Sequence, residues 1–224
     1  MTTTTGTAHA SNDRIVWIDC EMTGLDLTAD ALIEVAVVVT DSELAVLDDG
    51  FDVVIAPPPA ALEQMNDFVR AMHTSSGLLD DLAAGTTLAD AQARVLAYLQ
   101  KWVPEAGKAP LAGNSVGTDK AFLDRDMPDL VGHLHYRVID VSSIKELARR
   151  WYPRVYFASP QKNGGHRALA DILESIDELR YYRAALLVPQ PGPDSKIAKS
   201  IAAQIVATSV GGGASAGEDS PQTT

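Results

Sequence analysis

Apolar and β-branched runs separated by turn-forming residues dominate the first quarter of the chain. They predict strands over residues 14–19, 32–40 and 52–56. The second of these contains three consecutive valines at 37–39, and β-branched residues favour extended backbone. Three consecutive prolines at 57–59 follow the third run and predict its end.

The rest of the chain alternates helical and extended patterns. A helical stripe begins after Thr86 and Thr87, which are suitable N-cap residues, with apolar positions Leu88, Ala91, Val95, Leu99 and Trp102. Short strands over 111–114 and 137–141 each lead into a helix, the first of which covers residues 120–125. The later helices carry apolar faces made of Ile144, Leu147, Ala148 and Trp151, and of Leu169, Ile172, Leu173, Ile176 and Leu179.

Three strands followed by alternating strand and helix units predict an α/β fold with a mixed five-stranded sheet flanked by helices. The segments outside this pattern are polar or of low complexity. We therefore expect a flexible tail over residues 1–13 and one folded domain over residues 14–188. Residues 189–224 are expected to form a mostly flexible extension with a short amphipathic helix near residues 196–202.

Composition narrows the classes of function. The formal net charge of −12 over 224 residues argues against a broad basic surface for long nucleic acid and favours a small or short substrate. The single cysteine, Cys20, excludes an internal disulfide framework and a cysteine-based zinc site. No cationic segment precedes an apolar stretch near the N-terminus, and no apolar run reaches the roughly 18 residues of a membrane span. These observations predict a cytoplasmic protein that does not bind a membrane.

Two acidic residues stand at the end of an apolar run. Asp19 and Glu21 follow residues 15–18, and side chains two apart lie on one face of a strand, roughly 7 Å apart along it. Neighbouring carboxylates that lose hydration repel each other unless a cation lies between them. The alternative is an exposed strand end with solvated charges. Cys20 is expected to face the opposite side of the strand and to pack in the core.

Further acids and a histidine fall at the ends of elements. Asp119 lies in the first turn of the helix that follows strand 111–114, near the sheet edge where ligands collect. It could alternatively serve only the helix dipole. His166 follows a glycine pair, and Asp171 comes five residues later, about 140° away on a regular helix. We therefore expect His166 on a flexible turn and Asp171 in the second turn of the last helix. Alternatively, His166 is an ordinary surface loop residue.

Together, these five residues resemble the pattern of the DEDDh family of 3′-to-5′ exonucleases, whose fold is ribonuclease-H-like. Within that family the chain is most similar to the oligoribonucleases. The similarity is carried by residues 17–25 (WIDCEMTGL), 113–119 (GNSVGTD), 135–142 (HYRVIDVS) and 145–151 (KELARRW). These segments occur in the family's order and span most of residues 14–188.

The resemblance implies a site with two metal ions. Asp19, Glu21, Asp119 and Asp171 would be the carboxylate ligands of two Mg²⁺ or Mn²⁺ ions, with Asp19 bridging them. His166 would be the general base for the attacking water, moved into place by its glycine hinge. The implied reaction is 3′-to-5′ hydrolysis of very short oligoribonucleotides, especially dinucleotides, to nucleoside 5′-monophosphates.

The resemblance also implies contacts to the bases. Leu25 would act as an apolar wedge between two bases, and Ser115 would lie near a sugar or phosphate. Phe68 and His73 would stack on bases, which present a π-face whatever the sequence. The familiar oligoribonucleases have tryptophan at the position of Phe68, so ordinary core packing is the alternative for that residue.

The last implied contacts concern the 5′ end of the substrate. Tyr136, Arg137 and Ser142 would hold the 5′-phosphate of a short RNA, because a bidentate arginine suits a terminal phosphate. Tyr136 and Arg137 would reach in from the second protomer of a homodimer, and Tyr136 also counts among the catalytic residues. A capped 5′ end limits the length of the substrate.

Three other functions remain open from the sequence. One is a DEDDh exonuclease that acts on DNA 3′ ends, and a second is a non-catalytic RNA-binding module on the same fold. The third is a metal-dependent phosphatase for mononucleotides. The natural substrate of an oligoribonuclease-like enzyme also stays open between RNA fragments and a linear dinucleotide signal.

Overall fold

The computed structural model describes residues 13–161 and 165–211, with side chains described up to residue 208. The chain divides into two compact units, Met1–Leu186 and Leu187–Thr224. This boundary lies two residues from the one expected from the sequence. The N-terminal tail expected over residues 1–13 falls almost entirely outside the described residues.

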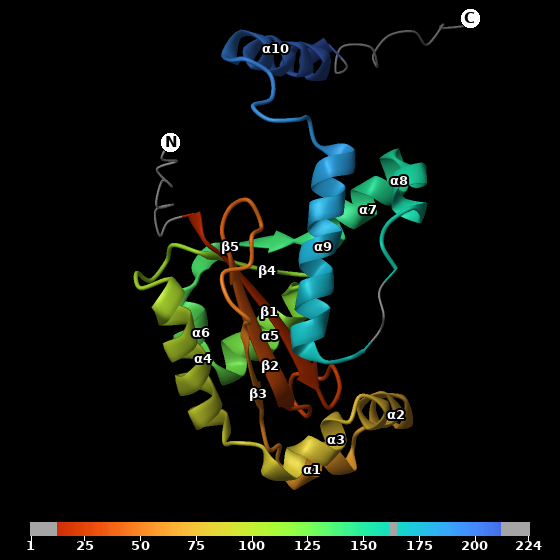
Figure 1. Ribbon diagram of the computed structural model, residues 1–224. Coiled ribbons are helices and arrows are strands. Elements are labelled where there is room, and N and C mark those ends of the chain that lie inside the picture. The colour runs from red at the N-terminus through yellow and green to blue at the C-terminus, as the bar shows by residue number, and fades with distance from the viewer. Residues whose placement is uncertain (1–12, 162–164, 212–224) are drawn as a thin grey trace, which may run out of the picture. The chain divides into compact units, whose positions relative to one another are not determined.

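A mixed five-stranded sheet forms the centre of the first unit. Its strands are β1 (Ile15–Met22), β2 (Leu32–Thr40), β3 (Phe51–Val54), β4 (Pro110–Gly113) and β5 (His135–Asp140). The order across the sheet is β3-β2-β1-β4-β5 (Figure 1). β1 pairs antiparallel with β2 and parallel with β4, while β4 and β5 are parallel. The prediction of a mixed five-stranded sheet is confirmed.

β1 is longer than the sequence predicted. It continues to Met22, beyond the expected end at residue 19, because β2 pairs with it along its whole length. Glu21 lies opposite Glu34 in this pairing. Both acids, Asp19 and Glu21, therefore belong to the strand itself.

Helices surround the sheet. In the first unit they are α1 (Pro59–Glu63), α2 (Asp67–Ser75), α3 (Leu78–Asp81), a 3₁₀ turn (Leu82–Ala84), α4 (Leu88–Trp102), α5 (Gly117–Asp126), α6 (Pro128–His133), α7 (Val141–Trp151), α8 (Pro153–Phe157) and α9 (Ala168–Leu186). The hydroxyl of Thr87 accepts a hydrogen bond from the backbone N–H of Asp90 and caps α4 as expected. The helices missing from the sequence prediction, α1, α2, α3, α6 and α8, are too short to show a clear apolar period.

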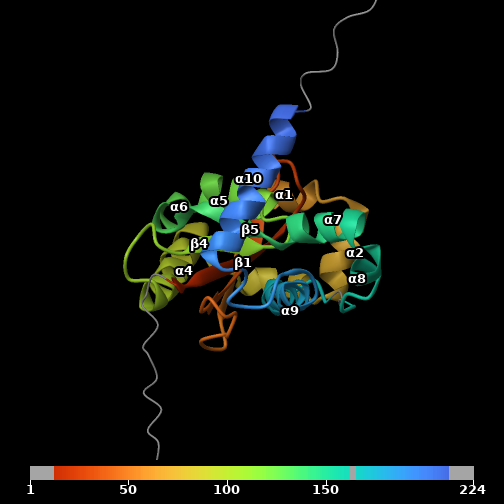
Figure 2. The same ribbon diagram turned by 90° about the horizontal axis from the view of Figure 1, so that it is seen from above.

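The side chains of the strands alternate between two cores. On one face Ile18, Cys20 and Val37 pack against α4 and α5, whereas on the other Trp17 and Ala36 pack against α7 and α9. Figure 2 shows α4, α5 and α6 on one side and α7, α8 and α9 on the other. Asp19 and Glu21 follow Trp17 along β1 at steps of two residues, so their side chains lie on the same face of the sheet as Trp17. That face is covered by α9.

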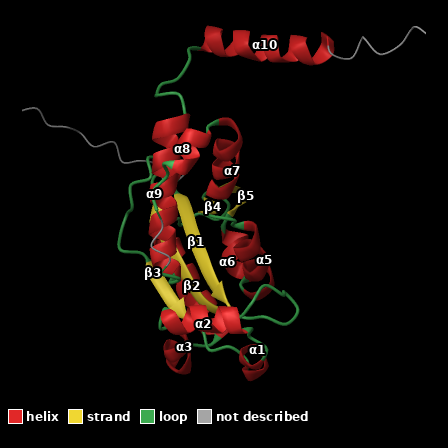
Figure 3. Ribbon diagram, turned by 90° about the vertical axis from the view of Figure 1, so that its right-hand side faces the viewer, coloured by secondary structure: helices red, strands yellow, loops and turns green. Residues whose placement is uncertain are grey.

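The helices α1, α2 and α3 gather at the end of the sheet toward which β1 points (Figure 3). A small apolar cluster of Ile33, Leu78 and Leu82 joins α3 and the following turn to β2. The carboxyl end of β1, where Glu21 lies, is therefore bordered by these short helices and by the start of α9.

The second unit contains α10 (Ser195–Gly211), which is longer than the helix expected near residues 196–202. Its apolar residues Ile197, Ile201 and Ile205 are exposed. Among the described residues of the whole chain, no helix is long and apolar enough to cross a membrane.

Candidate active site

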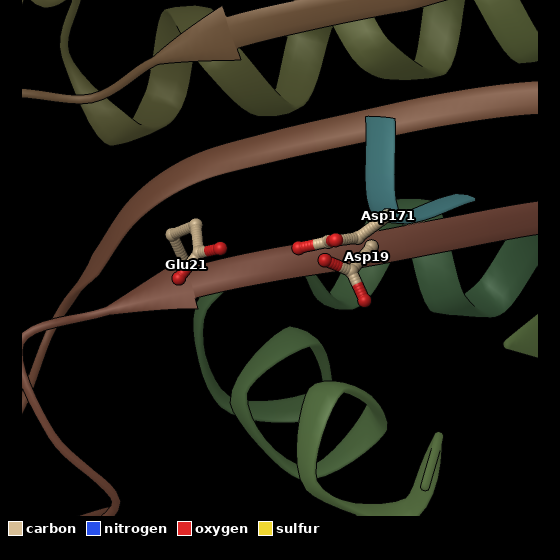
Figure 4. Close-up of side chains that lie close together, drawn as sticks. All are labelled: Asp19, Glu21 and Asp171. Carbon is tan, nitrogen blue, oxygen red and sulfur yellow. The ribbon is translucent and has the colours of Figure 1, made fainter. Parts of the chain in front are cut away.

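Three of the predicted acids meet on the α9 side of the sheet. Carboxylate oxygens of Asp19, Glu21 and Asp171 lie within 4.8 Å of one another (Figure 4). The first two project from β1, and the third comes from the first turn of α9 rather than the second, because that helix begins at Ala168. The expectation that Asp19 and Glu21 share one face of a strand is confirmed.

The fourth acid, Asp119, reaches the same strand from the other direction. It lies in the first turn of α5, is buried, and accepts a hydrogen bond from the backbone N–H of Cys20 at 3.1 Å. β4 ends at Gly113, so the parallel pairing stops before Cys20 and the Asp119 carboxylate takes the place of a strand partner. Asp119 is not a member of the three-carboxylate group, but it is bonded to the residue between two of that group's members.

Without a bound cation, burial and the neighbouring negative charges favour the protonated forms of Glu21 and Asp119. Burial is the largest cause that raises the pKa of Glu21 to about 8, and the charges of Asp19 and Asp171 add to it. Burial also raises the pKa of Asp119 to about 6. A divalent cation would relieve this repulsion, and Mg²⁺ and Mn²⁺ prefer oxygen ligands of this kind. The donor set therefore fits such an ion.

His73 has a different environment from the one expected. Its side chain is completely buried, so its ring is not accessible for stacking on a nucleobase of the substrate. Its Nε2 lies 2.9 Å from the Met22 carbonyl oxygen, and its Nδ1 lies 3.9 Å from a carboxylate oxygen of Glu21. Burial lowers the pKa of His73 and favours the neutral ring. His73 therefore lies beside Glu21 in the interior and is hydrogen-bonded through Nε2 to the Met22 carbonyl oxygen.

His166 is exposed and is separated from the start of α9 by Arg167 alone. Its φ of 47° is in the left-handed region, which non-glycine residues seldom adopt. Of the proposed glycine hinge, Gly165 is described and exposed, whereas Gly164 lies outside the described residues. The structure therefore places His166 in the segment that leads into α9, the helix that carries Asp171.

Leu25 and Phe68 are strongly exposed, at 74% and 79%. Phe68 is on α2, and its exposure excludes the alternative that it packs in the core. The loop that carries Leu25 is held by Asp30, which accepts hydrogen bonds from the Thr23 hydroxyl and the Asp26 backbone N–H, both at 2.9 Å. Both exposed side chains are therefore available to a bound molecule near the carboxyl end of β1.

Ser115 and Ser142 meet at the start of α7. Their hydroxyl oxygens are 3.1 Å apart. Both backbone N–H groups donate to the same carboxylate oxygen of Asp140, at 3.0 and 2.9 Å, and the Ser142 hydroxyl donates to Asn114. The pairing of these two residues, which are distant in sequence, comes from the parallel neighbours β4 and β5.

Tyr136 and Arg137 lie on β5, the edge strand of the sheet. Tyr136 is 77% exposed, and the guanidinium carbon of Arg137 is 5.4 Å from the centre of its ring. The rings of His135 and Tyr136 are stacked at 4.4 Å between centroids. This edge therefore presents aromatic and cationic side chains outward.

Sequence reasoning missed Glu34, Arg167 and Asp81, which connect the start of α9 to β2 and α3. One signal was available, since Glu34 interrupts the otherwise apolar run of residues 32–39. A charged residue on a buried strand requires a partner. The identity of that partner, more than a hundred residues away, is visible only in the fold.

Comparisons with known proteins agree with this geometry. The exonuclease family (RNase_T) matches residues 16–179. An oligoribonuclease of Streptomyces griseus is 71% identical over 196 residues, which are 88% of this chain and 98% of that protein. An oligoribonuclease of Mycobacterium tuberculosis (strain ATCC 25177 / H37Ra) is 56% identical over 211 residues, which are 94% and 97% of the two chains.

Solved structures of exonuclease I share the fold. A product-bound form has a TM-score of 0.57 at 15% identity and covers 77% of this chain and 43% of the other. The zinc-bound complex of the E. coli enzyme with single-stranded DNA has a TM-score of 0.57 at 16% identity, with 78% and 41% covered. This chain spans about two fifths of those longer proteins, and the likeness shows the fold alone. It confirms the ribonuclease-H-like class, and the sequence matches show that the chain belongs to the exonuclease family and, within it, to the oligoribonucleases.

Proposed function

We propose that the chain is a 3′-to-5′ exoribonuclease that hydrolyses very short oligoribonucleotides, dinucleotides in particular, to nucleoside 5′-monophosphates. The observation that carries the proposal is the convergence of Asp19, Glu21 and Asp171 within 4.8 Å on the face of β1. The exposed side chains of Leu25 and Phe68 border the same end of the strand. A partly buried acidic site next to exposed apolar groups suits a phosphodiester between two bases.

The acids would hold two divalent ions, Mg²⁺ or Mn²⁺. Asp19, Glu21 and Asp171 form one set of oxygen donors, and Asp119 would add a fourth carboxylate from the edge of β1 that pairs with β4. When bound, such ions neutralise charge on the phosphoryl oxygens and on the leaving oxygen. His73, whose ring lies beside the Glu21 carboxylate, would limit the movement of that side chain.

His166 would be the general base. Its exposure and its place before α9 let the imidazole approach a water at the carboxylate group. A neutral imidazole nitrogen can accept a proton from that water at neutral pH. The chain would thus separate its roles, with the acids holding cations and His166 moving the proton.

Substrate length would be set at the other end of the site. Ser115 and Ser142 lie together at the start of α7, and their hydroxyl groups would contact the 5′-phosphate, because their backbone N–H groups already donate to Asp140. Tyr136 and Arg137 point outward from the edge strand and would complete the 5′-phosphate pocket of a neighbouring protomer in a homodimer. The net charge of −12 is compatible with this arrangement because a short substrate needs only a small cationic pocket.

The test is product analysis on 5′-phosphorylated RNAs of two to seven nucleotides, with Mg²⁺ or Mn²⁺ and then with a chelator. We expect nucleoside 5′-monophosphates as products, the fastest turnover on the dinucleotide, and no turnover with the chelator. Equal rates over all lengths would contradict the 5′-end pocket. Faster cleavage of single-stranded DNA would favour a DNA exonuclease, and release of free phosphate from mononucleotides would favour a phosphatase. The cytoplasmic location stays a prediction.

A further inference from the structure

Arg167 bridges a buried strand and a short surface helix. Its Nε donates to one carboxylate oxygen of Glu34 at 3.0 Å, and one terminal nitrogen lies 2.8 Å from the same oxygen. Its other terminal nitrogen donates to Asp81 of α3 at 2.9 Å. Glu34 is 1% exposed, so one end of the bridge is anchored inside the protein. A guanidinium held between two carboxylates has few alternative positions.

The second oxygen of Glu34 anchors the next residue. It accepts the backbone N–H of Ala168, the first residue of α9, at 3.0 Å. The carbonyl of Arg167 in turn accepts the backbone N–H of Asp171 at 3.1 Å. One buried carboxylate therefore ties both the side chain of residue 167 and the first turn of α9 to β2.

Glu34 is also the register partner of Glu21 across the β1–β2 pair. The anchor point is thus on the strand adjacent to the two acids of β1 and on the same face of the sheet. His166 is joined by one peptide bond to the anchored Arg167, and its φ of 47° needs support from its surroundings. The bridge supplies that support on the side of the helix.

From this geometry we propose that Arg167 is a positioning residue for His166, fixed by Glu34 and Asp81. The inference rests on the proposed role of His166 as general base. The two oxygens of Glu34 have separable duties. The Glu34 oxygen that accepts from Arg167 orients His166. The Glu34 oxygen that accepts from Ala168 holds the start of α9 and thereby Asp171.

The primary variant is Arg167→Gln, which removes the charge and the fork of donors but keeps the Ala168–Glu34 bond. We expect kcat on a 5′-phosphorylated diribonucleotide to fall by about tenfold to a hundredfold, because a small displacement of a catalytic group has effects of this size. KM should stay within about twofold, since no substrate contact is removed. The affinity for Mn²⁺, measured by calorimetry, should not fall, because no proposed metal ligand is removed. A kcat within twofold of wild type would overturn the proposal.

A double variant distinguishes a loss of protein stability from a displacement of His166. Arg167→Gln alone leaves the buried Glu34 without its cation, which lowers thermal stability. The double variant Glu34→Gln with Arg167→Gln removes both charges and should regain thermal stability but keep the low kcat. Arg167→Lys should be intermediate in kcat, because one ammonium cannot bond Glu34 and Asp81 in the same geometry. Recovery of kcat together with stability in the double variant would contradict positioning.

Arg183→Gln is the matched control. Arg183 lies on the same helix and pairs with Glu43 at 2.5 Å, and neither residue belongs to the site. We expect this variant to keep wild-type kcat. A comparable loss in Arg183→Gln would show that α9 responds to any lost ion pair.

A cycle with His166→Ala distinguishes this inference from the proposed function. If Arg167 acts through His166, adding Arg167→Gln to His166→Ala should lower single-turnover rates no further. Multiplicative losses would show that Arg167 acts independently of the histidine and would overturn the inference. A fully active His166→Ala would instead overturn the role of His166 as base.

Discussion

The carboxylate of Asp119 accepts the backbone N–H of Cys20 at 3.1 Å, and Cys20 is the residue between Asp19 and Glu21. An acid on α5 is thereby bonded to the backbone of the strand that carries two other acids. The bond exists because β4 ends at Gly113 and leaves that edge of β1 open. Asp119 therefore has a structural role as well as the proposed role of metal ligand.

Two substitutions at Asp119 should separate these roles. Asp119→Asn keeps an oxygen acceptor for Cys20 and loses the charge, so we expect near-native thermal stability, weaker Mn²⁺ binding and a large loss of kcat. Asp119→Ala also leaves a buried N–H without a partner, which costs about 1–3 kcal/mol of unfolding free energy. Calorimetric Mn²⁺ titration and thermal unfolding measure the two effects. Native Mn²⁺ affinity in Asp119→Asn would exclude the residue as a ligand.

The stability of the metal-free protein should depend on pH through Glu21. Its pKa is about 8 in the folded chain against an ordinary value of 4.5, so between these values the folded state keeps a proton that the unfolded state releases. The contribution of Glu21 is therefore fully favourable below pH 4.5 and is lost as pH rises toward 8. Over that interval the loss is on the order of a few kcal/mol.

We expect the melting temperature of the metal-free protein to fall from pH 5 to pH 8 by several degrees. Glu21→Gln should flatten this dependence, because the neutral amide does not titrate. Saturating Mn²⁺ should raise the melting temperature more at pH 8 than at pH 5, since the cation replaces the proton. Differential scanning calorimetry measures all three. An identical pH dependence in Glu21→Gln would assign the effect to other groups.

Gly24 should tolerate no side chain. A Cβ at this position would lie 2.3 Å from a carboxylate oxygen of Asp30, the residue that holds the loop of Leu25. We expect Gly24→Ala to displace this loop and to raise KM for the dinucleotide by about tenfold, with a small change in melting temperature because the loop is at the surface. Gly132→Ala is a suitable control, because its Cβ would meet no atom within 4 Å. Unchanged KM in Gly24→Ala would show that the loop adapts.

Subunit mixing should test whether Tyr136 serves the partner's site. Tyr136→Ala and His166→Ala should each be nearly inactive as homodimers. In a mixed dimer, the protomer with Tyr136→Ala keeps its own His166 and receives Tyr136 from its partner, so one of the two sites is complete. Random exchange should therefore restore about a quarter of wild-type activity. No recovery, with exchange verified by mass spectrometry of the intact dimers, would place Tyr136 in its own protomer's site.

The Phe68 side chain should contribute to binding and not to folding. It is 79% exposed on α2, so Phe68→Ala should leave the melting temperature within about a degree of wild type. Loss of a stacking surface should raise KM by roughly tenfold, in line with about 1–3 kcal/mol for one base. Phe68→Trp should restore or improve binding. Steady-state kinetics on dinucleotides of different base composition measures both variants.

The long elements were predictable from local pattern. Residues 32–40 form a strand buried on both faces, as their β-branched run indicated, and residues 88–102 form a helix with one buried face, as their periodicity indicated. The short helices at the carboxyl end of β1 were not, because four to nine residues hold too few apolar repeats. Their positions depend on long-range packing, such as the contact of Leu78 of α3 with the cluster around Ile33 of β2.

His73 illustrates the limit of reading a residue by resemblance. Its position matched a base-stacking residue, yet the ring is buried between the Met22 carbonyl and Glu21. Sequence carries the residue type and its place on a helix, whereas exposure depends on what packs over that helix. The burial of His73 is a property of the assembled chain.

The sequence alone determined the alternation that turns Asp19 and Glu21 to one face of a strand and Cys20 to the other, because side-chain direction along a strand follows from backbone geometry. It also determined the family, through motifs that keep their order along the chain. Only the tertiary structure decided that Asp171 reaches those two acids, that Asp119 bonds to Cys20, and that Arg167 is held by Glu34 and Asp81. These contacts join residues 86 to 152 positions apart, and their geometry depends on the packing of α5 and α9 on the sheet, which no local pattern encodes.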